Sequence, residues 1–204
     1  RARDPKVVRS VVARVQKAAE GAAMATETKV SFEATGGVYN MLSNDTLGRL
    51  MDASMREVGG ESWTSEEQAF AQAMVKQLPS TPLPLESIKD IQPYTTGTLN
   101  ATSTDVSDVS WVTPTVGMTA ATWVPGTRSH SWQAAAASGT TIADKGGLVA
   151  AKSLSLTAAK LFRNPDLVRQ ARAEFEKRRG PGFVYQAMLG DRSPPLDYRA
   201  KGRD

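Results

Sequence analysis

The segment from residue 103 to residue 133 constrains the fold more than any other part of this sequence. It begins with hydroxyl and acidic residues and continues as a mostly apolar run from Trp111 to Trp123. It then passes through a Pro-Gly turn to His130, the one histidine among 204 residues. The apolar run favours strand conformation and is broken by Pro114, which predicts a turn followed by a strand that crosses a core.

The two polar ends of this segment form the candidate functional site. Asp105 and Asp108 stand three residues apart among serine and threonine residues that bond to nearby backbone, which predicts a compact loop. His130 follows the turn at Pro125 and Gly126, near the predicted strand end, where ligands gather in sheet-based enzymes. A neutral imidazole there can bind a metal ion or transfer a proton. A plainer alternative stays open, because a lone loop histidine is more often a surface residue and loop aspartates are usually turn formers.

Several runs of sequence point to a known family. The runs STDVSDVSWVTPT (103–115), GTRSHSWQ (126–133), IADKGGLVAAKSLSLTAAKLF (142–162) and NPDL (164–167) occur in order, before the tail GFVYQAMLGDRSPPLDYR (182–199). Together they resemble the C-terminal part of the M20 metallopeptidase and amidohydrolase family, from about Val7 to the tail. The resemblance implies an α/β fold: the C-terminal part of a zinc-peptidase-like catalytic domain (38–204), with a sheet flanked by helices. A remnant of an α+β lid or dimerisation domain (1–37) is expected before it.

The resemblance also assigns roles to the candidate residues. His130 occupies the position of the family's C-terminal metal-ligand histidine. The positions expected to bind substrate or to support the metal ligand are Ser103, Thr104, Asp105, Asp108 and Gly126. Thr102 stands where the family usually has glycine, a departure that bears on how closely the backbone approaches a substrate.

The implied activity is metal-dependent hydrolysis of the amide bond in N-acyl or aryl-amide conjugates of amino acids. Two divalent ions, zinc or manganese, are expected to share a bridging water. The family's catalytic base and its other metal ligands lie in an N-terminal part that this chain lacks, so no catalytic residue is expected here. The expected partners are that missing part of the same enzyme or a second chain, with a homodimer or heterodimer formed through the lid. The chain is then a nicked product, a truncated chain or a true subunit, and the alternative function is a non-catalytic partner or regulatory subunit.

Composition excludes several classes of protein. Hydrophobic residues make up 40% and charged residues 23% of the chain, which is typical of a globular rather than a disordered protein. The absence of cysteine excludes disulfides and thiolate metal sites and favours a cytoplasmic location. No apolar run is long enough to cross a membrane. The net charge of +4 comes without a groove-reading motif, so nucleic-acid binding is not expected and solvated helix faces explain the charge.

Periodicity and capping residues predict the remaining elements. A helix with an apolar face is expected to begin at Asp4 and Pro5, and alternating residues from Thr28 to Ala34 predict a half-buried strand. Gly36 and Gly37 are either a hinge of the lid or a simple turn. Further helices are expected over 46–58, capped by Asn44 or Asp45, over 65–78, opened by a capping box from Thr64 to Glu67, and over 145–162 and 165–178. An irregular proline-rich connection is expected at 79–93, a loop at 134–145, and a tail after 182 that lies on the surface or is frayed.

Overall fold

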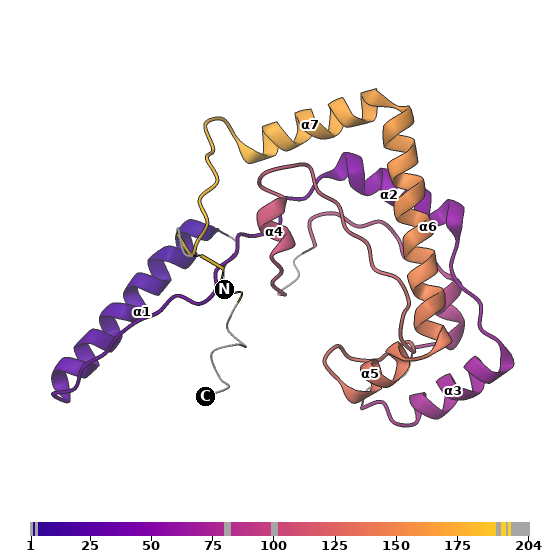
Figure 1. Ribbon diagram of the computed structural model, residues 1–204, viewed down its shortest axis with the longest axis horizontal. Coiled ribbons are helices and arrows are strands. Elements are labelled where there is room, and N and C mark those ends of the chain that lie inside the picture. Colours follow the sequence, from indigo (N-terminus) through magenta and orange to yellow (C-terminus); the bar gives the residue numbers. More distant parts are fainter. Residues whose placement is uncertain are drawn as a thin grey trace. The chain divides into compact units, whose positions relative to one another are not determined.

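The computed structural model describes residues 2, 4–79, 83–98, 102–190, 193, 194 and 196, and within them the chain forms helices and turns but no strand. The helices are α1 (Pro5–Ala25), α2 (Asp45–Val58), α3 (Ser65–Val75), the 3-10 helix η1 (Leu85–Lys89), α4 (Val106–Val109), α5 (Trp132–Ser138), α6 (Thr141–Arg163) and α7 (Pro165–Arg179) (Figure 1). Among these helices, none is both long enough and apolar enough to cross a membrane.

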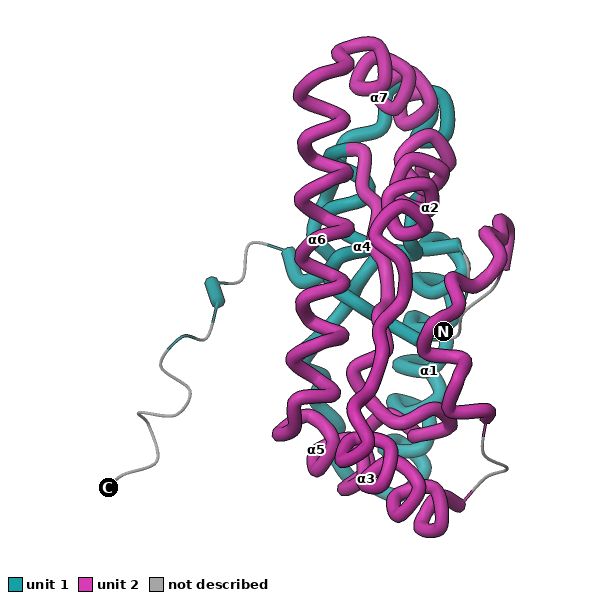
Figure 2. Tube along the Cα trace, turned by 90° about the vertical axis from the view of Figure 1, so that its right-hand side faces the viewer, with its two compact units in different colours: residues 1–42, 99–113, 177–204 teal, residues 43–98, 114–176 magenta. Residues whose placement is uncertain are grey.

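The chain divides into two compact units that are discontinuous in sequence. Unit 1 comprises residues 1–42, 99–113 and 177–204, and unit 2 comprises residues 43–98 and 114–176 (Figure 2). The predicted division at residue 37 into a lid part and a catalytic part stays a prediction.

The predicted α/β fold, with a sheet flanked by helices, is wrong for the described part of the chain. Residues 28–34, where alternation predicted a half-buried strand, run back alongside α1, form no strand and are all exposed (Figure 1). The predicted core strand at 111–123 starts instead with a turn, since the N–H groups of Val112 and Thr113 both donate to the carbonyl of Val109 at 3.0 Å. Alternation indicates which side of a strand is apolar, but a ladder also needs a partner backbone, which the pattern does not specify.

The helix N-termini in the structure follow the predicted capping residues. The side chain of Asp4 accepts a hydrogen bond from the backbone N–H two residues later, and that of Asn44 from the N–H three residues later. Thr64 and Glu67 form a reciprocal capping box at the start of α3. These caps supply acceptors to N–H groups that the first turn of a helix leaves unpaired.

The loop predicted at 134–145 is wrong, because this region contains most of α5 and the start of α6. The hydroxyl of Ser131 accepts the N–H of Ala134 at 3.2 Å and so caps α5, which the following alanines favour strongly. α6 therefore begins at Thr141 and not at Lys145. α3 ends at Val75, three residues before the predicted end at Leu78.

In unit 2, α6 packs against α2. Both helices carry buried hydroxyl residues: Ser54 on α2, and Ser153 and Thr157 on α6. Each hydroxyl donates to a carbonyl one turn earlier on its own helix, at 2.8–2.9 Å, and Thr157 also contacts the sulfur of Met51. Because these polar groups are satisfied within their own helices, the two helices can pack through small side chains without leaving buried donors unpaired.

Glu174 fixes α7 to the N-terminus of α2. Its carboxylate accepts the N–H groups of Asp45 and Thr46 at 2.7 and 2.9 Å, and the hydroxyl of Thr46 at 2.7 Å. The side-chain amide of Asn44 donates to the carbonyl of Ala171 at 2.8 Å. A negative charge is favourable at a helix N-terminus, so this contact both satisfies N–H groups and interacts with the helix dipole.

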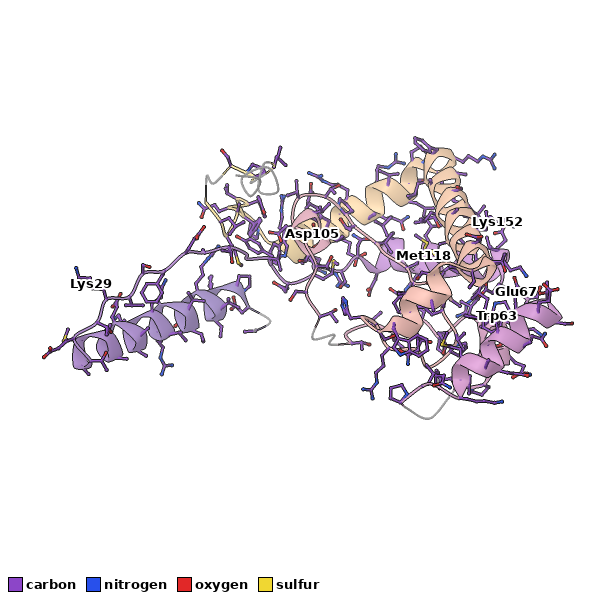
Figure 3. The ribbon with its side chains drawn as sticks, turned by 60° about the horizontal axis from the view of Figure 1, so that its bottom comes forward. Lys29, Trp63, Glu67, Asp105, Met118 and Lys152 are labelled. Carbon is purple, nitrogen blue, oxygen red and sulfur yellow. The ribbon has the colours of Figure 1, made fainter. Side chains whose placement is uncertain are left out.

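A buried ion pair joins α3 to α6. The side chain of Glu67 is 8% exposed, and its carboxylate accepts hydrogen bonds from Lys145 at 2.5 Å, Thr141 at 2.6 Å and the N–H of Thr64 at 2.6 Å. These hydrogen bonds lower the pKa of Glu67 to about 2, and the bond from Lys145 has the largest effect. The adjoining apolar core consists of Trp63, Ala71, Met74, Ile88, Val124 and Ile142 (Figure 3, which labels Trp63 and Glu67).

We predict that Glu67→Gln lowers the free energy of unfolding at neutral pH by about 1–3 kcal/mol, because the charged acceptor of three hydrogen bonds is lost. The pKa of Glu67 lies below its ordinary value of 4.5, so its contribution is fully present above about pH 4.5 and is lost as pH falls towards about 2. Urea unfolding at a series of pH values measures both effects.

The matched control is Glu66→Gln, at the exposed neighbour on the same helix. We expect this variant to stay within about 0.5 kcal/mol of the wild type. A gap between wild type and Glu67→Gln that stays constant down to about pH 2 would contradict the assignment.

Candidate functional site

The loop that carries the two aspartates lies in unit 1 and is compact, as its sequence predicts. The hydroxyl of Thr104 accepts the N–H of Val106 at 3.3 Å. The hydroxyl of Ser107 donates to the carbonyl of Thr104, and that of Ser110 donates to the carbonyl of Ser107 at 2.5 Å. These local bonds close the single turn of α4, with Asp105 at its start (Figure 3).

Asp108 is engaged in holding unit 1 together. One carboxylate oxygen accepts the backbone N–H of Tyr39 at 3.2 Å, and the other accepts the hydroxyl of Tyr185 at 2.8 Å. The hydrogen bond from Tyr185 to this carboxylate is the main reason why the pKa of the Tyr185 phenol is raised. Both oxygens of Asp108 therefore have partners within the fold, which is a structural role for this residue.

An aromatic cluster surrounds this contact. The ring centroids of Trp111 and Phe183 are 4.7 Å apart, and that of Tyr39 lies 5.5 Å from the ring of Tyr185 and 5.6 Å from that of Trp111. The hydroxyl of Tyr39 donates to the carbonyl of Gln186 at 3.0 Å. Phe183 and Tyr185 thus pack against other rings of unit 1 while Val184 is 74% exposed. This part of the tail therefore lies on the surface of unit 1, which is one of the two arrangements that the sequence predicted.

Ser103, Thr104 and Asp105 form the exposed part of the loop. The side chain of Asp105 makes no cap to α4, and it accepts a long hydrogen bond of 3.5 Å from the hydroxyl of Thr104. Two hydroxyls and a carboxylate at an exposed position can accept and donate hydrogen bonds to a small polar molecule. The expected role of these three residues in binding a ligand stays a prediction.

His130 lies in unit 2 at the end of the predicted Pro-Gly turn. Val124 is 1% exposed and anchors this turn, in which its carbonyl accepts the N–H of Thr127 at 3.0 Å. Gly126 has a φ of 90°, which glycine adopts freely. His130 itself is exposed and has a φ of 58°, a conformation that costs a residue with a side chain free energy. The next residue, Ser131, caps α5, so the imidazole projects from a short and well-fixed turn.

The structure thus places the candidate residues in two groups. Ser103, Thr104, Asp105 and Asp108 belong to unit 1, and Gly126 and His130 belong to unit 2. Within the described ranges, no set of three or more histidine, aspartate and glutamate side chains is arranged to hold a metal ion. The imidazole of His130 is a donor that suits zinc or manganese, but a complete site needs further nitrogen or oxygen ligands.

Comparison with known proteins shows that this chain is similar in sequence to a subunit of a hydrolase. It is 32% identical over 194 residues to a subunit of the p-aminobenzoyl-glutamate hydrolase of Escherichia coli (strain K12), an alignment that covers 83% of this chain and 40% of the relative. The chain therefore spans 40% of the length of this curated relative. No family model matches the chain, and no solved structure matches it. The resemblance to a hydrolase inferred from the sequence motifs is confirmed, whereas the wider M20 family stays an expectation.

We predict that the two loop aspartates differ in their effect on stability. Asp108→Ala should lower the free energy of unfolding by about 1–3 kcal/mol, because it leaves the part-buried N–H of Tyr39 without its acceptor. Asp105→Ala, at the exposed position three residues earlier, should change it by less than about 0.5 kcal/mol. Urea unfolding of the two variants measures the difference, and the reverse order would refute the structural role of Asp108.

Proposed function

We propose that this chain is part of a metal-dependent amidohydrolase that cleaves the amide bond of p-aminobenzoyl-glutamate or of a related aryl-amide conjugate of an amino acid. The observation that carries the proposal is the similarity to the E. coli hydrolase over 83% of this chain. The name of that relative specifies a substrate and describes one component of an assembly. Transferring both to this chain is part of the proposal.

In this proposal His130 supplies one imidazole ligand to a divalent ion, zinc or manganese. Such ions, when bound, lower the pKa of a water molecule and polarise an amide carbonyl. The support from this chain is the exposed position of His130 on a turn fixed by the cap of α5, which holds the ring outside the apolar core. A ligand on a fixed turn loses little conformational freedom when it binds a metal ion.

The exposed residues of the unit 1 loop are proposed to bind the substrate. The hydroxyls of Ser103 and Thr104 can donate hydrogen bonds to a carboxylate such as those of a glutamate moiety. The carboxylate of Asp105 can accept a hydrogen bond from an amine or amide N–H. Asp108 is not proposed to contact substrate, because its two oxygens already bond to Tyr39 and Tyr185.

The catalytic base and the remaining metal ligands are proposed to come from another part of the enzyme. A single imidazole does not make a two-ion site, which needs a bridging carboxylate and further ligands. That other part is either additional sequence of the same polypeptide or a second chain. The intact mass of the purified enzyme, together with its metal content per chain, distinguishes these sources.

A second candidate function, a partner or regulatory subunit without chemistry of its own, is favoured by α1. This helix has 21 residues and none of them is buried. Val7, Val11 and Val15 form an apolar stripe at four-residue intervals and are 47%, 49% and 61% exposed. Exposed apolar stripes of this kind mark contacts with other proteins. In this case catalysis would not depend on His130.

We predict that His130→Ala in the assembled enzyme lowers the rate of p-aminobenzoyl-glutamate hydrolysis by about 100-fold or more and lowers the metal content. The expectation follows from the cost of losing even an outer partner of a metal site, which is about 10–100-fold. Release of glutamate and metal analysis measure the two effects. Unchanged activity and metal content would favour the non-catalytic subunit.

His130→Gly is the matched variant that separates function from folding. It also lacks the imidazole, but glycine relieves the backbone cost of the left-handed conformation, by up to about 1 kcal/mol relative to alanine. We expect His130→Gly to be at least as stable as His130→Ala and equally inactive. Arg128→Ala, at an exposed position of the same turn, is expected to keep metal content near that of the wild type.

A further inference from the structure

Glu61 is a buried acidic residue that the proposed hydrolase function does not use. It lies in unit 2 between α2 and α3 and is 7% exposed. Its backbone N–H donates to the carbonyl of Ile88 at 3.3 Å. The preceding Gly60 lies so close to η1 that a Cβ there would collide with the carbonyls of Ile88 and Lys89. The backbone of Gly60 and Glu61 is therefore held against η1.

The two oxygens of this carboxyl group have different surroundings. Oε1 accepts the indole N–H of Trp63 at 3.1 Å. Oε2 is buried and has no hydrogen-bond partner within the described part of the chain. An ionised carboxylate with one buried oxygen left unpaired is costly, whereas a protonated one carries no net charge.

The nearby charges do not compensate an ionised Glu61. Lys145 on α6 is the nearby cation, and its ammonium group already bonds to the carboxylate of Glu67 at 2.5 Å and to the carbonyl of Ser62 at 2.9 Å. Glu67 on α3 adds a like charge, and η1 presents backbone carbonyls to this region while the side chain of Lys89 is exposed. Burial raises the pKa of Glu61, and Glu67 raises it further, against the opposing effects of Trp63 and Lys145.

We propose that Glu61 is a pH-sensitive switch of unit 2, protonated when this corner of the fold is fully packed and a source of instability once it ionises. The group acts on the apolar core through Trp63, which is its hydrogen-bond partner and a member of that core. The same core contains Val124, which anchors the turn that leads to His130. A change in the charge of Glu61 thus acts on the packing beneath that turn.

The expected pH dependence has a definite sign. An unfolded glutamate ionises near pH 4.5, and Glu61 in the folded chain ionises at a higher pH. Between these two values the unfolded state binds fewer protons, so stability falls as pH rises. Glu67 contributes a slope of opposite sign, which fades within about one pH unit above 4.5 because unfolded Glu67 is then ionised as well. The comparison with Glu61→Gln removes this contribution, since both chains contain Glu67.

The test is urea unfolding of the full chain from about pH 4.5 to neutral pH. In the wild type, Glu61 should raise the unfolding equilibrium constant by up to tenfold per pH unit until its own pKa is passed. Glu61→Gln should lack this component and be flatter with pH, whereas Glu66→Gln, at an exposed neighbour, should keep the wild-type slope. Parallel profiles for the wild type and Glu61→Gln would overturn the proposal.

A second measurement covers the case in which Glu61→Gln does not fold. Carboxyl carbons of glutamate are labelled with carbon-13 in the wild-type chain, and their chemical shifts are followed by NMR as pH rises. The carboxyl signal of Glu61 should titrate above the ordinary value of 4.5. If every glutamate of the folded chain titrates at or below about pH 4.5, Glu61 is not held protonated and the proposal fails.

Discussion

The carboxylate of Glu67 is the interaction on which the arrangement of unit 2 depends most. It closes the capping box of α3 and also accepts hydrogen bonds from Thr141 and Lys145 at the start of α6. One acidic side chain thus fixes the beginnings of two helices that are far apart in sequence. A buried charge is tolerated only where donors surround it, so these residues restrict how α6 can lie while the apolar core around Trp63 and Ile142 packs.

The same principle recurs elsewhere in the molecule. Glu174 reaches from α7 to the first N–H groups of α2, and in unit 1 Asp108 accepts the N–H of Tyr39. In each case an acidic side chain supplies acceptors to backbone donors that no regular element satisfies. Segments distant in sequence are therefore joined at such donors as well as through apolar contacts, in a chain that leaves many apolar side chains exposed.

The sequence predictions are right where the interaction joins residues close in sequence, and wrong or missing where it joins residues far apart. Asn44 and Thr64 act on N–H groups within three residues, so their caps were predictable from neighbouring residues, as was the turn at Pro125 and Gly126. The strand predicted at residues 28–34 depended on a partner that no local pattern specifies, and that prediction is wrong for the described residues. The role of Asp108 was also unpredictable locally, because its partner Tyr39 lies 69 residues away.

The two aspartates of the loop show that a sequence motif does not by itself assign the role of each residue in it. Asp105 and Asp108 are the same residue type in one short run, yet the fold uses both oxygens of Asp108 and leaves Asp105 at the surface. The N–H of Tyr39 in unit 1 needs an acceptor, and this need explains the presence of an aspartate at position 108 without any ligand. It accounts for neither Asp105 nor His130, which has a left-handed backbone conformation with a φ of 58°. The proposal of ligand binding therefore rests on the exposed residues 103–105 and on His130, and not on Asp108.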